Sequence, residues 1–137
     1  MSWLTWALLS ALFAGVTAVL AKAGTKDLDS NLATAIRTTV ILVLAWGIVF
    51  ASGVSVRGIP SRALLFLVLS GVATGLSWLC YFRALQLGDV ASVAPIDKLS
   101  VVFALAFAAI FLGEALTWQH YVGGSLIVLG AIIIAWR

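Results

Sequence analysis

Four charged side chains lie inside stretches that are otherwise apolar enough to cross a membrane: Arg37, Arg83, Asp97 and Lys98. An Asp or Lys near the middle of a bilayer costs about 2.5 to 3.5 kcal/mol, so such charges need partners or water. Asp97 and Lys98 closely follow Pro95, which lacks the amide donor that a regular helix uses. Charges at such positions commonly bind a substrate or a coupling ion. We therefore take these five residues as candidate substrate or coupling contacts.

Composition indicates that these charges belong to an integral membrane protein. Of the 137 residues, 64% are hydrophobic and 9% are charged, whereas a soluble domain has roughly 45 to 50% and 25%. Mean hydropathy is +1.19. The formal net charge is +3, but the eight basic residues are scattered singly, and this pattern argues against a nucleic-acid partner.

Five apolar segments come close to the roughly 20 residues that a membrane-spanning helix needs, and short connections join them. The sequence therefore predicts an all-α membrane protein with five transmembrane helices in a single domain, 1–137. The expected spans cover about 3–21, 31–52, 63–84, 91–112 and 117–136.

Small residues at helical spacing predict where these helices pack. Gly71 and Gly75 form a GxxxG pattern in the third span, and Gly123 and Gly130 give the fifth span a small-residue face. In the fourth span, Pro95 disfavours a helical residue before it, so we expect the regular helix to begin only around Pro95. Free backbone groups would then lie near the charged pair that follows.

Helix geometry places the four charges at one depth. The connections after the first and third spans lie on the same membrane face, and the four residues are five to eight residues away from them. That corresponds to a depth of roughly 8 to 12 Å. Asp97 and Lys98 point about 100° apart on a helix, so we expect Asp97 to pair with Arg83 or Arg37 instead. Three bases against one acid leave a positive excess for an anionic group of a substrate or a lipid.

The role of Arg37 has two interpretations. Its side chain either snorkels back to the headgroups or faces the helix bundle, where Asn31, Thr34 and Thr38 form a polar stripe beside it. The whole cluster also has a structural alternative, in which ion pairs fasten the second, third and fourth spans together.

The charges of the connections give only a weak orientation signal. Basic residues number four on one face and two on the other, which slightly favours an outside N terminus and an inside C terminus. So small a bias is compatible with insertion in both orientations. The basic residues counted are Lys22, Lys26, Arg83 and Arg137 against Arg57 and Arg62.

Arg37 in the second span and three short motifs together resemble the small five-span members of the EamA family in the drug/metabolite transporter superfamily. The motifs are FRALQLG at 82–88, APIDKLS at 94–100 and FLGE at 111–114. The resemblance covers the whole chain and implies one EamA unit, half of an inverted-repeat transporter fold. Some small four-span drug exporters use a glutamate in the first span, and here the first span has no acidic residue. That mechanism is therefore not carried over.

The resemblance implies a secondary transporter in the inner membrane of a bacterial or archaeal cell. It would export a small metabolite, amino acid or drug-like solute by alternating access as a homodimer, with antiparallel protomers. Two other functions stay open. The basic excess at headgroup depth suits a subunit of a lipid-linked precursor translocase, and the GxxxG face suits a non-transporting assembly or accessory protein.

An enzyme is not expected from this sequence. It contains no GxSxG, HExxH or P-loop pattern, and a nucleophile needs a base within reach. His120 has no second histidine, nearby carboxylate or zinc-like spacing, so we interpret it as an interfacial residue. The sequence accordingly predicts no metal site and no cofactor.

Overall fold

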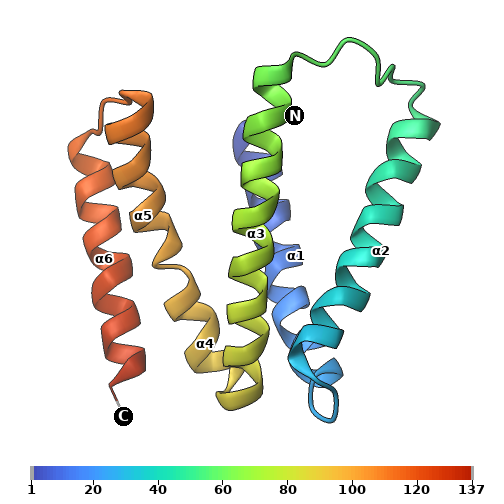
Figure 1. Cartoon of the computed structure of the whole chain (residues 1–137). Coiled ribbons are helices and arrows are strands. Elements are labelled where there is room, and N and C mark those ends of the chain that lie inside the picture. The colour runs from blue at the N-terminus through green and yellow to red at the C-terminus, as the bar shows by residue number, and fades with distance from the viewer. Residues whose placement is uncertain (1, 137) are drawn as a thin grey trace. The chain divides into compact units, whose positions relative to one another are not determined.

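The computed structural model describes residues 2–136, which form helices joined by short connections (Figure 1). Helices α4 and α5 and the π-helical turn η1 follow one another directly and make up one membrane-length segment. The described residues thus contain five segments long and apolar enough to cross a membrane, and no strand. The predicted all-α architecture with five membrane-spanning helices is confirmed. The elements are α1 (Trp3–Gly24), α2 (Ser30–Ala51), α3 (Ser61–Leu87), α4 (Val90–Asp97), α5 (Ser100–Phe107), η1 (Ala108–Leu112) and α6 (Trp118–Ala135).

Two helices extend beyond the expected ranges. Helix α1 continues to Gly24 and α3 to Leu87, each three residues past the ends predicted at 21 and 84. Polar side chains in these last turns form tertiary hydrogen bonds, which are described below. They can therefore lie within a helix and do not need the water that surrounds a connection. Asp29 caps the start of α2: its Oδ1 accepts hydrogen bonds from the amides of Asn31 (2.9 Å) and Leu32 (3.1 Å).

The chain divides into two compact units, Met1–Leu87 and Gly88–Arg137, and each is described by itself. In the first unit, α3 packs against both α1 and α2. The side chains of Leu85 and Phe82, near the end of α3, are 0% and 2% exposed and form the best-buried part of this packing. In the second unit, α6 packs against α4 and α5. A single domain over 1–137 stays a prediction.

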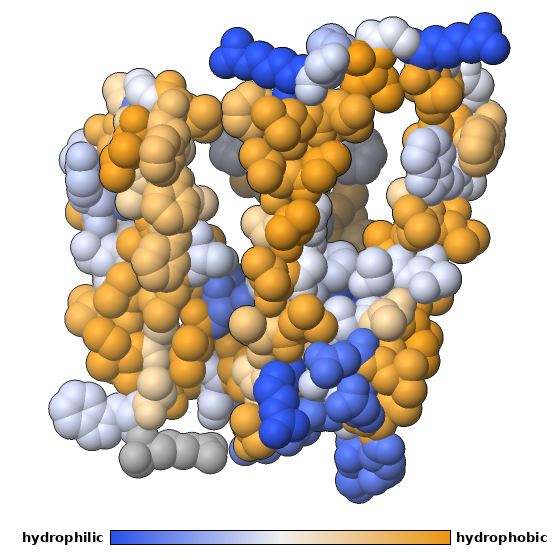
Figure 2. All heavy atoms as spheres, in the orientation of Figure 1, coloured by the Kyte–Doolittle hydropathy of each residue, from blue (hydrophilic) through white to orange (hydrophobic). Residues whose placement is uncertain are grey.

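Large apolar side chains cover the flanks of the helices, whereas hydrophilic side chains gather mainly toward the helix ends and connections (Figure 2). Val43, Leu67 and Phe50 illustrate this exposure, since each is more than half exposed. Such surfaces are far more apolar than those of soluble monomers and are suited to contact with lipid or with other helices. The apolar periphery is what the composition of the chain predicts.

The fourth span begins earlier than expected. Helix α4 starts at Val90, after Asp89, whose carbonyl accepts hydrogen bonds from the amides of Ser92 (3.0 Å) and Val93 (2.9 Å). Pro95 lies inside this helix. The prediction of a regular helix starting around Pro95 is therefore wrong, because a proline restricts its predecessor without preventing a capped turn from forming upstream.

The helix breaks after Pro95. The amides of Lys98 and Leu99 bond three residues back, to the carbonyls of Pro95 (3.1 Å) and Ile96 (3.0 Å), which is the tighter 3₁₀ pattern. The pyrrolidine ring also excludes a hydrogen bond to the carbonyl of Ala91 and crowds it. The irregular backbone thus lies at and after the charged pair, between α4 and α5.

The span ends in the η1 turn at Gly113. This residue has φ 68° and ψ 22°, the left-handed conformation that closes many helices and that glycine adopts without strain. The amide of Glu114 then donates to the carbonyl of Ala108 (3.2 Å), so the wide last turn is capped by its own backbone.

The glycines predicted for helix packing lie on open faces of the described chain. No atom of another element comes within 4 Å of a Cβ built at Gly71, Gly75, Gly123 or Gly130. Gly124 instead faces a neighbouring helix, because its Cβ would lie 3.6 Å from Leu105 Cδ1. A packing role for the first four glycines against another helix stays a prediction.

Candidate functional site

Arg37 lies about two turns inside α2 and its side chain turns toward α3. The central carbon of its guanidinium is 4.1 Å from the ring centroid of Trp78 and 5.4 Å from that of Phe82. Both distances are within the roughly 6 Å over which a cation is attracted to an aromatic face. These contacts agree with the bundle-facing interpretation of Arg37, since a snorkelling side chain would extend toward the membrane surface.

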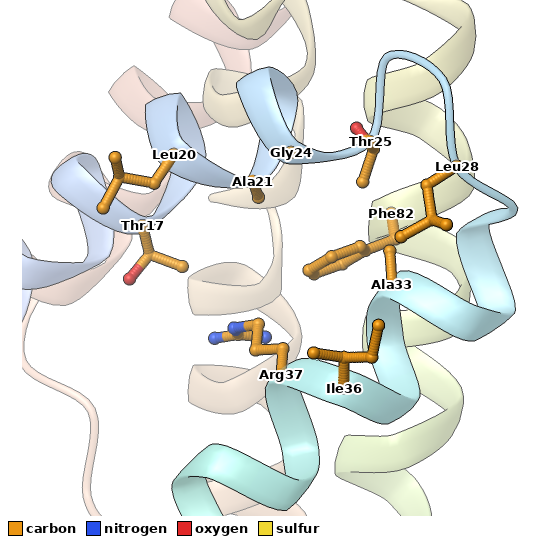
Figure 3. Close-up of a pocket in the computed structure, with 10 residues that line it drawn as sticks. All are labelled: Thr17, Leu20, Ala21, Gly24, Thr25, Leu28, Ala33, Ile36, Arg37 and Phe82. Atoms are coloured by element: carbon orange, nitrogen blue, oxygen red, sulfur yellow. The ribbon is translucent and has the colours of Figure 1, made fainter.

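A pocket of about 340 Å³ opens beside this stack, between α1, α2 and the end of α3 (Figure 3). In Figure 3 the guanidinium of Arg37 points from α2 into the space opposite Thr17 of α1. The walls are mainly aliphatic and aromatic, and none of the lining residues is acidic. The lining residues are Thr17, Leu20, Ala21, Gly24, Thr25, Leu28, Ala33, Ile36, Arg37 and Phe82.

The threonines of the predicted polar stripe bond to their own helix. Thr34 Oγ1 donates to the carbonyl of Ser30 (2.8 Å), and Thr38 Oγ1 donates to the carbonyl of Thr34 (2.7 Å). Asn31 is exposed at the start of α2. The stripe lies where helical spacing places it, but its hydroxyl hydrogens are already committed to the backbone.

A polar network at the end of α3 holds the connection between α1 and α2 in place. Lys22 Nζ donates to the carbonyl of Leu85 (2.6 Å), one of the last carbonyls of α3. Gln86 Nε2 donates to the carbonyls of Leu28 (2.6 Å) and Thr25 (3.3 Å). Arg83 is exposed, and its Nη1 donates to Gln86 Oε1 (3.0 Å). Arg83 therefore orients Gln86 and does not line the pocket of the first unit.

Sequence reasoning missed Lys22 and Gln86 as structural residues. The sequence indicates a charge of the connection at Lys22, whereas in the structure its ammonium lies at the last carbonyls of α3, where a cation interacts favourably with the helix dipole. Gln86 stands within the motif at 82–88, so the signal was present in the residues that carry the family resemblance.

Asp97 and Lys98 form an ion pair with each other. Lys98 Nζ lies 3.2 Å from Asp97 Oδ2, and the two side chains are 55% and 34% exposed, respectively. The expectation that neighbours 100° apart would not pair is wrong here, because Lys98 follows the last residue of α4 and the backbone leaves the α-helical hydrogen-bonding pattern there. Pairing of Asp97 with Arg37 or Arg83, which belong to the other unit, stays a prediction.

Pro95 and Lys98 line a second cavity, of about 430 Å³, between α4 and α6. Its remaining walls are aliphatic or small, and they include Gly130 and Ala131 of α6. The charged step of the fourth span therefore borders a cavity within its own unit.

His120 has a structural role at the start of α6. Its Nδ1 accepts a hydrogen bond from the amide of Thr117 (3.0 Å), completing a capping box with that residue. Among the described residues, no group of three or more His, Cys, Asp or Glu side chains could hold a metal ion.

Five membrane-length helices and an arginine held in an apolar pocket are the features of a multi-pass membrane transporter. The model of the EamA-like transporter family matches residues 1–136, and the chain belongs to this family. The family resemblance noted in the sequence is thus confirmed.

Similar proteins differ in how much of each chain the similarity covers. An uncharacterized transporter in the cobO 3' region of a Sinorhizobium species is 53% identical over 136 residues, which are 98% of this chain and 96% of that protein. A probable terminal-alkyne amino-acid exporter of Streptantibioticus cattleyicolor is 36% identical over 89 residues, 62% of this chain and 29% of the exporter.

A third relative is a probable 4-amino-4-deoxy-L-arabinose-phosphoundecaprenol flippase subunit, ArnE, of Yersinia pseudotuberculosis. It is 29% identical over 72 residues, which are 53% of this chain and 63% of that subunit. No solved structure gave a significant match.

Proposed function

We propose that this protein is a secondary transporter of a bacterial or archaeal inner membrane that exports a small solute. The stack of Arg37 on Trp78 beside the pocket carries the proposal. A guanidinium inside a membrane helix is costly, and here aromatic rings fix it next to a space large enough for a small solute. In a family of transporters, this arrangement is best explained as a substrate site.

The proposed working form is a homodimer of antiparallel protomers that moves substrate by alternating access. The similarity to a transporter of nearly the same length, over almost all of both chains, supports a five-span unit as one protomer of this dimer. In many secondary transporters, two repeats of inverted topology rock about a site between them. A second copy inserted in the opposite orientation would supply the missing repeat.

Within this mechanism, Asp97 and Lys98 are the proposed coupling residues. Their ion pair lies at the backbone break that follows Pro95, and irregular backbone in membrane helices commonly lines substrate or ion sites. Arg83 is proposed to support the site through Gln86. No catalytic role, metal or cofactor is proposed.

Efflux from reconstituted vesicles tests the transport function. Vesicles loaded with radiolabelled solutes, including amino acids and monocarboxylates, are compared with protein-free vesicles, using wild type, Arg37→Gln and Arg62→Gln. Arg62 is the matched control, since it also contacts an aromatic ring (Phe66, 5.9 Å) but lies outside the pocket. We expect wild type and Arg62→Gln to release solute and Arg37→Gln to lose the flux. Equal flux from both variants would refute the site.

Accessibility of tags at the two termini tests the dimer. Equal labelling from both sides of the membrane supports antiparallel protomers. Labelling of each terminus from one side alone would contradict them and would require a parallel oligomer or a separate partner chain.

A second candidate function is that of a subunit in a lipid-linked precursor translocase. The similarity to ArnE and the single cation of the pocket favour it. Flipping of a fluorescent lipid-linked sugar phosphate across the vesicle membrane, without efflux of soluble solutes, would select this function over the exporter.

A further inference from the structure

The pocket of the first unit carries one formal charge. Arg37 is the sole charged side chain among its ten lining residues. Within the described residues of the first unit, no carboxylate forms an ion pair with the Arg37 guanidinium. A cation in low-dielectric surroundings without a counter-charge attracts an anion strongly.

We propose that this pocket binds a small organic anion with an apolar body, whose single anionic group bonds to the Arg37 guanidinium. This proposal rests on the proposed function for its biological role, but it concerns binding and is tested separately from transport.

The aromatic stack determines which part of the guanidinium the ligand meets. Trp78 and Phe82 lie 4.1 Å and 5.4 Å from its central carbon and so compete for contact with its faces. The planar N–H edges remain for hydrogen bonding, and a carboxylate matches two parallel N–H donors in that plane. In Figure 3 this end of Arg37 faces the open space of the pocket.

The walls disfavour cations and zwitterions. An ammonium group would meet a like charge, and the lining offers it no carboxylate. The hydroxyls of Thr17 and Thr25 are neutral acceptors, and the carbonyls of Thr25 and Leu28 already accept from Gln86. The aliphatic and aromatic side chains of Leu20, Ile36 and Phe82 instead suit an apolar body.

The volume limits the size of this ligand. About 340 Å³ is near the lower end of the roughly 300 to 1,000 Å³ range of small-molecule pockets. The pocket therefore accommodates a compact monoanion or one anionic headgroup. The same chemistry has two sources, a free carboxylate or a phospholipid whose phosphate bonds to Arg37.

Three probes with one benzene ring and different charge test the proposal: phenylacetate, phenylacetamide and phenethylamine. Binding is measured by calorimetry on the full-length protein in nanodiscs of phosphatidylcholine. We expect phenylacetate to bind most tightly. Arg37→Gln should weaken the binding of phenylacetate about 10- to 100-fold, because a charge-assisted hydrogen bond is lost. The affinity for phenylacetamide should stay nearly unchanged. Arg62→Gln, the control outside the pocket, should change neither.

Two further measurements keep the test decisive if Arg37→Gln folds poorly. Arg37→Lys retains the charge without the planar fork, so it should keep the preference for phenylacetate with reduced affinity. Circular dichroism and gel-filtration elution identify the folded variants. Equal or tighter binding of phenethylamine or phenylacetamide overturns the proposal, and so does phenylacetate affinity that a folded Arg37→Gln leaves unchanged.

Nanodiscs that contain phosphatidylglycerol distinguish the two sources of the anion. Weaker apparent binding of phenylacetate to the wild type in these discs than in discs of phosphatidylcholine alone supports occupation of the pocket by the lipid phosphate. Unchanged binding supports a soluble carboxylate. Charge-selective binding without efflux would refute the proposed exporter and leave the ligand class standing, whereas efflux without charge selectivity would refute the ligand class alone.

Discussion

The contact between Arg37 and Trp78 predicts a measurable coupling energy. In a double-mutant cycle, Trp78→Leu removes the ring, Arg37→Met removes the guanidinium and keeps an unbranched stem, and the double variant removes both. A cation over an aromatic ring contributes about 0.5 to 1 kcal/mol at exposed sites and about 2 kcal/mol when desolvated. Both side chains are half-buried, and their separation of 4.1 Å is close. We therefore expect a coupling of about 1 kcal/mol.

Phe82 limits how large this coupling can be. It lies 5.4 Å from the guanidinium carbon, so part of the attraction to an aromatic face remains after Trp78 is removed. A triple variant that also carries Phe82→Leu should reveal this remainder as a further, smaller loss. Since Phe82 is 2% exposed, the triple variant also loses core packing. Its stability is therefore compared with the stabilities of the variants that carry the same substitutions separately.

The assay is unfolding in mixed micelles, followed by far-ultraviolet circular dichroism, because Trp78 itself contributes to fluorescence. The matched control is the cycle of Arg62 and Phe66, a more distant pair at 5.9 Å whose ring is well exposed. The coupling energy of the Arg62–Phe66 pair should not exceed the roughly 0.3 to 0.5 kcal/mol within which independent substitutions are additive. If the Arg37–Trp78 cycle is additive within the same limit, the stack does not hold the guanidinium, and the site argument fails.

Three other substitutions have distinct expected outcomes. Asp97→Asn should abolish efflux from reconstituted vesicles while membrane insertion stays intact; wild-type flux would contradict a coupling role. Gln86→Leu should remove both bonds to the connection between α1 and α2, so hydrogen exchange there should quicken; unchanged protection at Leu28 would show that these bonds do not hold it. Pro95→Ala should restore an amide that can donate to the carbonyl of Ala91, and it should raise the free energy of unfolding in mixed micelles by up to about 3 kcal/mol. A more regular helix should also slow efflux. Faster efflux would contradict a functional helix break.

Much of the fold was predictable because the membrane imposes it. A bilayer requires long apolar helices with internally satisfied backbones, so five apolar segments identify five spans with little ambiguity. Helix ends were less predictable, as the extended ends of α1 and α3 show. Lys22 and Gln86 look like residues of a connection by composition, yet tertiary hydrogen bonds keep them within helices.

The candidate site was predicted in part. Helical spacing left two interpretations of Arg37 open, snorkelling or bundle-facing, and the stack on Trp78 agrees with the second. Its aromatic partner Trp78 carries no local signal, since a contact between α2 and α3 depends on packing. The Asp97–Lys98 pair was predicted wrongly because regular helical geometry was assumed at a position where the helix ends.

The polar network at the end of α3 also determines how the pocket can change. Thr25 and Leu28 line the pocket, and both are bonded through their carbonyls to Gln86. Lys22, one residue from the lining residue Ala21, is bonded to the carbonyl of Leu85 at 2.6 Å. Any separation of α1 from α3 must therefore exchange these bonds for others before the pocket widens. Because a hydrogen bond to a charged group contributes about 1.5 to 3 kcal/mol, the Lys22 contact opposes widening more strongly than the apolar walls alone would.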